Sequence, residues 1–332
     1  MTASPSPPLT VVMYHFVRPL AATPFPRLTA LDLAAFREQL AYITRHYTPV
    51  ALSEVIAAAN GSALPPRPIV LTFDDGYADH YRHVFPLLAD SGVTAAFFPT
   101  SRTLIDRRML DVNKIQFVLA AAESPARLVA MIEEAVLRQT GRAGIGTPET
   151  YRREGWAPTR YDAAEVAYVK RMLQRLLPEQ MRSDLLDTLF AALVSGDEAG
   201  FAAELYFTVE QAREMIAAGM ELGCHGDQHV MLTTLTRDAQ AREIDGALRV
   251  LDVVGRPRQG FAYCYAKGDH NADSVDLLHS RGCAIALTTK TGLATVTPGS
   301  MLTVPRIDAN DLPIDAAAPP NDWTLRAVDG GA

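Results

Sequence analysis

Short apolar segments alternate with amphipathic helical patterns along most of this chain. Apolar runs with the length of buried strands occupy residues 9–14, 49–52, 69–73, 93–98, 220–224, 260–263, 283–288 and 302–304. Apolar positions recur at helical spacing in 32–46, 79–91, 236–254 and 271–281. Thr208 and Gln211, three residues apart, indicate the capping box of another helix. Such alternation predicts a parallel β-sheet with helices packed outside it, the α/β class.

Two architectures satisfy this alternation. Seven or eight strand–helix units can close into a barrel, and an open, doubly wound sheet is the alternative. No Gly-x-Gly-x-x-Gly sequence follows any of the predicted strands, which weakens a nucleotide-binding open sheet.

Residues 106–206 interrupt the alternation, because they carry almost no strand pattern. Four helical segments fill most of this stretch, at 114–122, 126–139, 162–177 and 178–194, with a polar loop at 141–159. We expect a helical insertion at 106–206 that divides the barrel into 1–105 and 207–312, either as a lid over the active face or as a peripheral layer. The tail at 313–332 is rich in Ala, Pro and Gly and is expected to be irregular.

Composition narrows the possible functions. Of the 332 residues, 48% are hydrophobic and 21% charged, as in ordinary soluble enzymes. The net charge of −7 argues against a nucleic-acid partner, and no apolar run approaches the roughly 20 residues of a transmembrane segment. Residues 1–10 lack the basic and apolar regions of a signal peptide, so the chain is expected to be cytoplasmic. Cys224, Cys264 and Cys283 form no disulfide framework and no Cys-x-x-Cys zinc motif, and they are expected to be buried.

The first candidate for chemistry is a strand that ends in two carboxylates and a glycine, Thr72-Phe73-Asp74-Asp75-Gly76. Adjacent side chains at a strand end point in different directions, so Asp74 and Asp75 can take two roles. The carboxyl ends of the strands form the catalytic face of a parallel barrel. A solvated Asp-Gly turn is the alternative for this motif taken alone.

A pair of histidines, His225 and His229, also follows a predicted strand. Two histidines four residues apart can bind one metal, and two imidazoles with one carboxylate leave the open positions of a catalytic zinc site. Two structural histidines are the alternative for the pair alone. The glutamate of a His-Glu-x-x-His protease is missing, so that class is excluded.

A third motif, Phe-Ala-Tyr-Cys-Tyr at 261–265, ends another predicted strand. A backbone N–H at this position can face a metal and hold a developing oxyanion. Buried aromatic residues without a chemical role are the alternative.

The three motifs in this order resemble those of the polysaccharide deacetylases, a family that includes chitin and peptidoglycan deacetylases. The resemblance covers 11–98 and 207–308 and implies a distorted barrel of strands and helices. It implies a hydrolase that removes an N-acyl group, normally acetyl, from an amino sugar or glycan precursor. In that family the first Asp of the motif is the base and the second binds the metal. The resemblance therefore implies Asp74 as base and Asp75, His225 and His229 as ligands of a divalent metal, with the Tyr265 N–H in the oxyanion hole.

Several positions depart from the family pattern. Gly226 stands where a Ser or Thr is usual, Ala262 replaces an arginine, and Cys264 replaces a proline. The late histidine that serves as general acid is also missing, since no histidine follows His279. The usual mechanism carries over only in part.

Other residues are expected to fill the missing roles. Arg306 follows the last predicted strand, and we expect it to hydrogen-bond Asp74 in place of the missing arginine. His15 directly follows the first predicted strand, in a Met-Tyr-His sequence that resembles the start of one branch of the family. We expect His15 to be the general acid, with His270 as its closest competitor. Asn113 and Lys114, where the insertion begins, are expected to bind the substrate.

Zinc is the expected metal, although affinity order alone leaves cobalt and nickel open. An amidase or deformylase acting on another amide is an alternative, as is an inactive carbohydrate-binding relative. A non-haem iron oxygenase is a further alternative, because His225 and Asp227 have its His-x-Asp form. Such sites usually lie on a double-stranded β-helix, which alternating strands and helices do not indicate.

Overall fold

The computed structural model describes residues 7–142 and 144–329, and the chain divides into two compact units. The barrel unit comprises Met1–Pro19, Ala30–Arg108 and Ala202–Ala332. The helical unit comprises Leu20–Thr29 and Met109–Phe201. Its main segment lies within the insertion expected at 106–206, and the contribution of Leu20–Thr29 is an addition to that expectation.

Parallel strands form a ring in the barrel unit. The main sheet has the order β10-β1-β5-β6-β7, and β8 pairs with β9. Single parallel bridges join Cys224 to Tyr263 and Leu287 to Val304. These bridges link the end of β7 with β8, and β9 with the segment that leads into β10. The expected distorted barrel is confirmed in this form, with short strands and single bridges along one part of the ring.

Most strands are shorter than their apolar runs. Their bounds are β1 (Thr10–Tyr14), β2 (Val17–Arg18), β3 (Leu31–Asp32), β4 (Thr48–Pro49), β5 (Pro68–Asp74), β6 (Ala95–Phe98), β7 (Glu221–Leu222), β8 (Ala262–Cys264), β9 (Ile285–Leu287) and β10 (Ile307–Asp308). The β4 strand pairs with the start of β5, and β2 pairs with β3 outside the ring. The strand expected at 302–304 is reduced to the bridge at Val304, and β10 follows it.

Three aromatic rings fix the register of neighbouring strands. Tyr14 lies opposite Phe73, and Phe73 lies opposite Phe97. The stacked rings have centroid distances of 4.8 Å and 5.0 Å, and all three side chains are buried. Stacked pairs of this kind contribute about 0.5–1.5 kcal/mol each beyond the area they bury. Because side chains alternate along a strand, this packing directs Asp74, the residue after Phe73, to the opposite face of the sheet.

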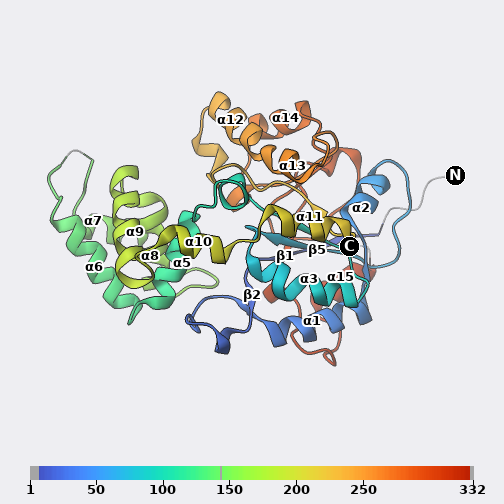
Figure 1. Ribbon diagram of the computed structural model, residues 1–332, viewed down its shortest axis with the longest axis horizontal. Helices are drawn as coiled ribbons and strands as arrows, with labels where there is room; N and C mark the ends of the chain where they lie inside the picture. Colours follow the sequence, from blue (N-terminus) through green and yellow to red (C-terminus); the bar gives the residue numbers. More distant parts are fainter. Residues whose placement is uncertain (1–6, 143, 330–332) are drawn as a thin grey trace. The chain divides into compact units, whose positions relative to one another are not determined.

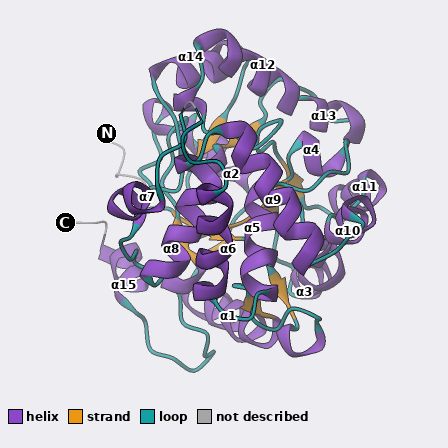
Figure 2. Cartoon of the chain, turned by 90° about the vertical axis from the view of Figure 1, so that its left-hand side faces the viewer, coloured by secondary structure: helices purple, strands orange, loops and turns teal. Residues whose placement is uncertain are grey.

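Helices cover the strands of the barrel unit from both sides. Figure 1 shows α12, α13 and α14 on one side of β1 and β5, with α1 and α3 on the other, and Figure 2 shows the strands between the same groups. The bounds are α1 (Leu33–His46), α2 (Leu52–Ala59), α3 (Phe85–Asp90), α4 (Ser101–Leu104), α11 (Val209–Ala217), α12 (Arg237–Ala247), α13 (Arg249–Val254), α14 (Ala272–Ser280) and α15 (Asp322–Asp329). Among the described residues, no helix is both long and apolar enough to cross a membrane.

Three helical features differ from the expectations. The helix expected at 79–91 begins with a π-helical turn, η2 (His80–Val84), and the one expected at 236–254 breaks at Leu248 into α12 and α13. The tail expected to be irregular contains α15. This helix is fixed by tertiary contacts that composition does not reveal, since the Thr324 hydroxyl bonds the Tyr42 and Tyr47 hydroxyls at 2.7 Å and 2.9 Å.

The helical unit is built from α5 (Asp111–Ala121), α6 (Pro125–Leu137), α7 (Pro148–Gly155), α8 (Ala164–Arg171), the π turn η3 (Met172–Leu176) and α9 (Glu179–Leu193). Helix α10 (Glu198–Leu205) leads the chain back to the barrel unit. The loop expected at 141–159 contains α7. Phe25 packs its ring against Phe117 and Phe201, with centroid distances of 5.0 Å and 5.9 Å, which accounts for the inclusion of Leu20–Thr29 in this unit.

Candidate metal centre and active site

Asp75, His225 and His229 meet at the carboxyl ends of the strands. The Asp75 Oδ1 atom lies 3.5 Å from His225 Nε2 and 3.6 Å from His229 Nε2. All three side chains are less than a tenth exposed, and their ligand atoms lie within 4.8 Å of one another. One carboxylate and two imidazoles at this spacing form the donor set of a catalytic zinc site. These residues therefore fit a divalent metal.

The backbone after β5 turns sharply to present Asp75. Asp75 and Gly76 both have positive φ angles, 71° and 78°. A Cβ atom at Gly76 would lie 2.8 Å from the Cβ atom of Pro99, so only glycine fits there. The Tyr77 hydroxyl donates to Asp75 Oδ2 at 2.5 Å, which orients the carboxylate with Oδ1 toward the histidines.

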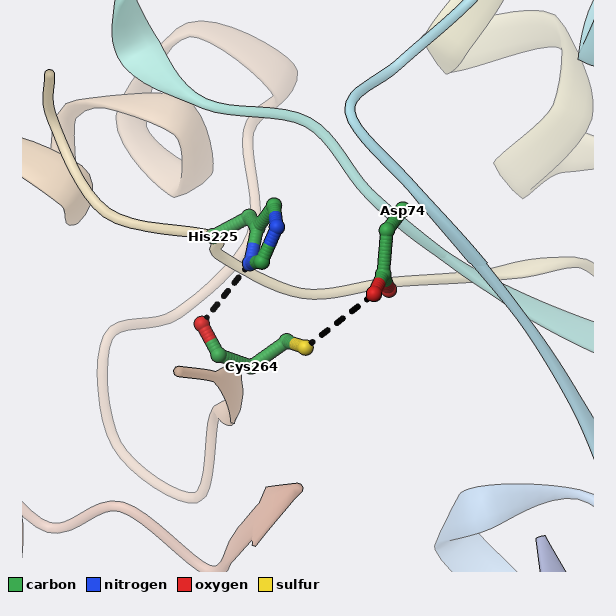
Figure 3. A group of neighbouring side chains, drawn as sticks. All are labelled: Asp74, His225 and Cys264. Carbon is green, nitrogen blue, oxygen red and sulfur yellow. Dashed lines mark hydrogen bonds between the residues drawn. The ribbon is translucent and has the colours of Figure 1, made fainter. Parts of the chain in front are cut away.

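Hydrogen bonding and burial prepare both imidazoles to bind a metal. His225 Nδ1 donates to the Cys264 carbonyl at 2.9 Å (Figure 3). Its Nε2, which lies 3.5 Å from Asp75 Oδ1, therefore carries the lone pair. Burial lowers the pKa of His229 to about 3, and the opposing effect of Asp75 is smaller. His229 is therefore neutral at pH 7, the form that binds metals. Burial raises the pKa of Asp75, but His229, His15 and His225 together bring it below its usual value.

Asp74 forms a buried ion pair with Arg306. Its Oδ1 and Oδ2 accept from Arg306 Nη1 and Nη2 at 2.9 Å and 2.8 Å, and both side chains are at most 2% exposed. Burial raises the pKa of Asp74, but Arg306, His225 and His15 together outweigh this effect and hold the pKa below its usual range. Arg306 is held in turn by the Thr288 carbonyl and the Thr72 hydroxyl at 2.9 Å and 3.1 Å. The expected hydrogen bond between Arg306 and Asp74 is confirmed.

Cys264 links the ion pair to the histidines. Its Sγ accepts from Arg306 Nη2 at 3.0 Å and donates to Asp74 Oδ2 at 3.5 Å, while its carbonyl holds His225 (Figure 3). Asp74, His225 and Cys264 also have ligand atoms within 4.8 Å of one another. A cation among them would lie beside the Arg306 guanidinium, and like charges in a buried site repel strongly. The cluster of Asp75, His225 and His229 is therefore the better metal site.

His15 lies close enough to the carboxylates to act on them electrostatically. It follows β1, is half-buried, and contributes to lowering the pKa of both Asp74 and Asp75. Its expected role as general acid remains a prediction. The expected competitor His270 packs its ring on Tyr265 at a centroid distance of 5.0 Å.

His80 supports the site from below, through the residue that carries the candidate acid. His80 is fully buried, and its Nε2 donates to the His15 carbonyl at 2.8 Å. The π-helical turn that begins at His80 places this side chain beneath the candidate acid. Burial lowers the pKa of His80 to about 4, although the bond to His15 opposes this effect.

Acid should therefore destabilise the fold through His80. In the unfolded chain the His80 imidazole is protonated near pH 6.5, whereas in the folded protein it stays neutral down to about pH 4. The stabilisation that comes from keeping His80 neutral is fully present above pH 6.5. As the pH falls toward 4 it is lost, which lowers the free energy of unfolding by about 3 kcal/mol. Denaturant titrations between pH 7 and 4 should show a weaker pH dependence for His80→Gln than for the native protein. His83→Gln, on the same turn, is the control, and equal pH dependence of His80→Gln and the native protein would contradict the assignment.

The expected role of the Tyr265 backbone is contradicted. Its N–H donates to the Leu287 carbonyl at 3.0 Å, as part of the link between β8 and β9, and so does not point at the metal centre. The Tyr265 hydroxyl donates to the Leu302 carbonyl at 3.0 Å. Tyr265 therefore supports the barrel wall beside the site, and we assign it no oxyanion contact.

Asn113 and Lys114 lie in the helical unit on α5 and are buried. The Lys114 ammonium group lies 2.7 Å from a carboxylate oxygen of Asp187 and 2.7 Å from one of Glu198. Asn113 donates to the Gln116 side chain at 3.2 Å. These contacts give Lys114 a part in joining helices of its own unit. Substrate contact by either residue stays a prediction, which these contacts do not support.

Two residues of the site escaped the sequence analysis. Tyr77 follows Asp75 by two residues, so proximity to the motif was an available signal. Glu243, on α12, binds the loop between the two histidines, with Oε1 accepting from the N–H groups of Asp227 and Gln228 at 2.9 Å and 2.7 Å. No local pattern marks Glu243, because its partners are distant in sequence.

Comparisons with known proteins agree with this fold. The family model for polysaccharide deacetylase matches residues 61–137 and 171–286, more than half of the chain. Poly-beta-1,6-N-acetyl-D-glucosamine N-deacetylase of Escherichia coli (strain K12) is 38% identical over 79 residues, which make up 23% of this chain and only 12% of that protein.

Solved structures extend the likeness over nearly the whole chain. The deacetylase PplD of Streptococcus pyogenes superposes with a TM-score of 0.55 at 16% identity, covering 92% of this chain and 93% of that one. IcaB from Ammonifex degensii superposes with a TM-score of 0.53 at 18% identity, covering 99% of each chain. At these identities the likeness establishes the fold.

Proposed function

The chain belongs to the polysaccharide deacetylase family, and from this premise we propose that it is a metal-dependent hydrolase that removes an N-acetyl group from an amino sugar. The observation that carries the proposal is the pairing of a buried, ionised Asp74 with the adjacent donor set of Asp75, His225 and His229. A base beside a metal centre is the arrangement needed for attack of water on an unreactive amide.

Asp75, His225 and His229 would hold a divalent cation, for which we propose zinc, with cobalt and nickel as alternatives. When bound, such an ion supplies Lewis acidity, which makes a water more acidic and polarises the acyl carbonyl. Asp74 needs this help, because a carboxylate stabilised by Arg306 is a weak base.

The side chains then divide the proton transfers between them. Asp74 accepts a proton from the attacking water, while Arg306 keeps its carboxylate in one orientation. The water oxygen bonds to the acyl carbon, and the bond from carbon to nitrogen breaks. We propose that His15 donates the proton that the leaving amine requires, so that acetate and a free amine are released.

The amide chemistry of the site and the family of the chain together support the proposed substrate. An N-acetylated amino sugar, free or in a glycan precursor, contains the amide that this site can hydrolyse. The Escherichia coli relative is named for a polymer of N-acetylglucosamine, but the matched residues are a small part of it. A different amide, such as a formamide, is the alternative, because nothing in the metal centre selects the acyl group.

A screen of N-acyl amino sugars should release the corresponding acid, detected by mass spectrometry. Activity should fall on chelation and return with zinc. His225→Ala should lose most of its metal by elemental analysis, because one of three protein ligands is gone and its Nε2 faces Asp75. His83→Ala, outside the cluster, should keep its metal. Full metal occupancy in His225→Ala would overturn the ligand assignment, and absence of acid release from every sugar would favour the alternative amide.

A further inference from the structure

The loop that carries the two histidines, residues 225–230, has an unusual backbone conformation. Gly226 has a φ angle of 84°, and His229, a candidate metal ligand, has a φ angle of 61°. A positive φ at a residue other than glycine is strained and persists only where the surroundings enforce it. This conformation therefore requires a group that contacts the loop and holds it.

Glu243 is that group. Glu243 lies on α12, and the residue is 7% exposed. Its Oε1 accepts from the N–H groups of Asp227 and Gln228 at 2.9 Å and 2.7 Å. One buried carboxylate thus holds two backbone donors of the loop between the histidines. Hydrogen bonds to a charged acceptor are stronger than those between neutral groups.

The contact also gives a reason for glycine at position 226. A Cβ atom on Gly226 would lie only 3.0 Å from Glu243 Oε1. A larger residue would push the carboxylate away from the loop, and the positive φ would add strain. Gly226 and Glu243 are therefore coupled, because the lack of a side chain at Gly226 leaves space for the Glu243 carboxylate.

We propose that Glu243 is a positioning residue that sets the affinity of the metal centre by holding the histidine loop in its ligating conformation. This inference rests on the proposed metal-dependent function. Glu243 touches none of the three ligands through its side chain in the contacts described, so it acts through the backbone that presents His229. Partners that orient metal ligands in this indirect way are typically worth roughly 10- to 100-fold in metal affinity.

Three variants test the proposal. Glu243→Ala removes every bond to the loop, whereas Glu243→Gln keeps an oxygen that can accept from Asp227 and Gln228 but loses the charge. Asp245→Ala is the matched control, because Asp245 lies on the same helix and pairs with Arg281 away from the loop. Each protein is stripped with a chelator, checked for folding by circular dichroism, and titrated with zinc against a chromophoric competitor.

Zinc should bind roughly 10- to 100-fold more weakly to Glu243→Ala, with Glu243→Gln between it and the native protein. Asp245→Ala should match the native affinity. At saturating zinc, the kcat of Glu243→Ala should return to within about threefold of native, as expected of a residue that positions the metal. Cobalt-substituted Glu243→Ala should also show an altered visible spectrum, which a loss of stability alone does not produce.

Native affinity in folded Glu243→Ala would overturn the proposal, as would a kcat that stays low with affinity unchanged. Should Glu243→Ala fail to fold, Glu243→Gln carries the test, and native affinity in that variant also overturns it. Failure of the proposed function looks different, because zinc would then bind the native protein no better than it binds His225→Ala.

Discussion

Asp74→Asn should lower turnover by about two orders of magnitude or more and leave the metal in place. The amide cannot accept the proton of the attacking water, whereas Asp75, His225 and His229 are unchanged. The substitution also leaves the Arg306 guanidinium buried without its counter-charge, since both partners are at most 2% exposed. Breaking such a pair costs about 3–5 kcal/mol, so the free energy of unfolding must be measured along with kcat and metal content.

A second buried ion pair provides a control that separates loss of catalysis from loss of stability. Arg18 and Asp79 lie 2.7 Å apart in the barrel unit, with side chains 10% and 9% exposed. Asp79→Asn should lose stability in the same way as Asp74→Asn but keep most of its turnover. If Asp74→Asn retains near-native kcat with its metal bound, or if both variants lose activity equally, Asp74 is not the base.

The local part of the site could be predicted from the sequence. Asp74, Asp75, His225 and His229 each follow an apolar strand, and parallel strands bring their carboxyl ends to one edge. Arg306 followed from the same reasoning, because it comes after the apolar run at 302–304, the last predicted strand.

The errors arise where distant partners decide the outcome. The Tyr265 N–H was expected in the site but is used by Leu287, since β8 pairs with β9. Lys114 was expected to bind the substrate, but its ammonium group pairs with carboxylates 73 and 84 residues further along the chain, on Asp187 and Glu198. Glu243 was missed for the same reason. Sequence periodicity reports which face of an element is buried and says nothing of the specific polar atom it meets.

The boundaries of helices were also only partly predictable from the apolar spacing. The break at Leu248 and the π turn at His80 both lie inside continuous helical patterns, so the apolar spacing alone does not reveal them. The π turn matters most for function, because it brings the His80 ring under the His15 carbonyl. Departures from regular helix geometry of this kind occur frequently at functional sites.

His15→Ala should lower kcat by about two orders of magnitude while metal content stays native. An amine anion is a very poor leaving group, and the described site offers the His15 imidazole, which acts electrostatically on both carboxylates, as the proton donor. The backbone carbonyl that accepts from His80 remains in the variant, so the support beneath the site is kept. Turnover, metal content and thermal unfolding of the variant, measured side by side, check the prediction.

The leaving group provides a sharper test of His15 than kcat alone. The aniline of an activated anilide leaves with little protonation. Loss of the general acid should therefore lower the rate of anilide hydrolysis far less than the rate for an amino-sugar amide. His15→Ala should therefore recover most of its activity on acetanilides with electron-withdrawing groups, whereas Asp74→Asn should stay impaired on both substrates, because attack by water still needs its base. His270→Ala is the matched control, since His270 packs on Tyr265 beside the site. If His270→Ala shows the dependence on the leaving group and His15→Ala does not, the proton comes from His270, and His15 acts on the site only through its charge.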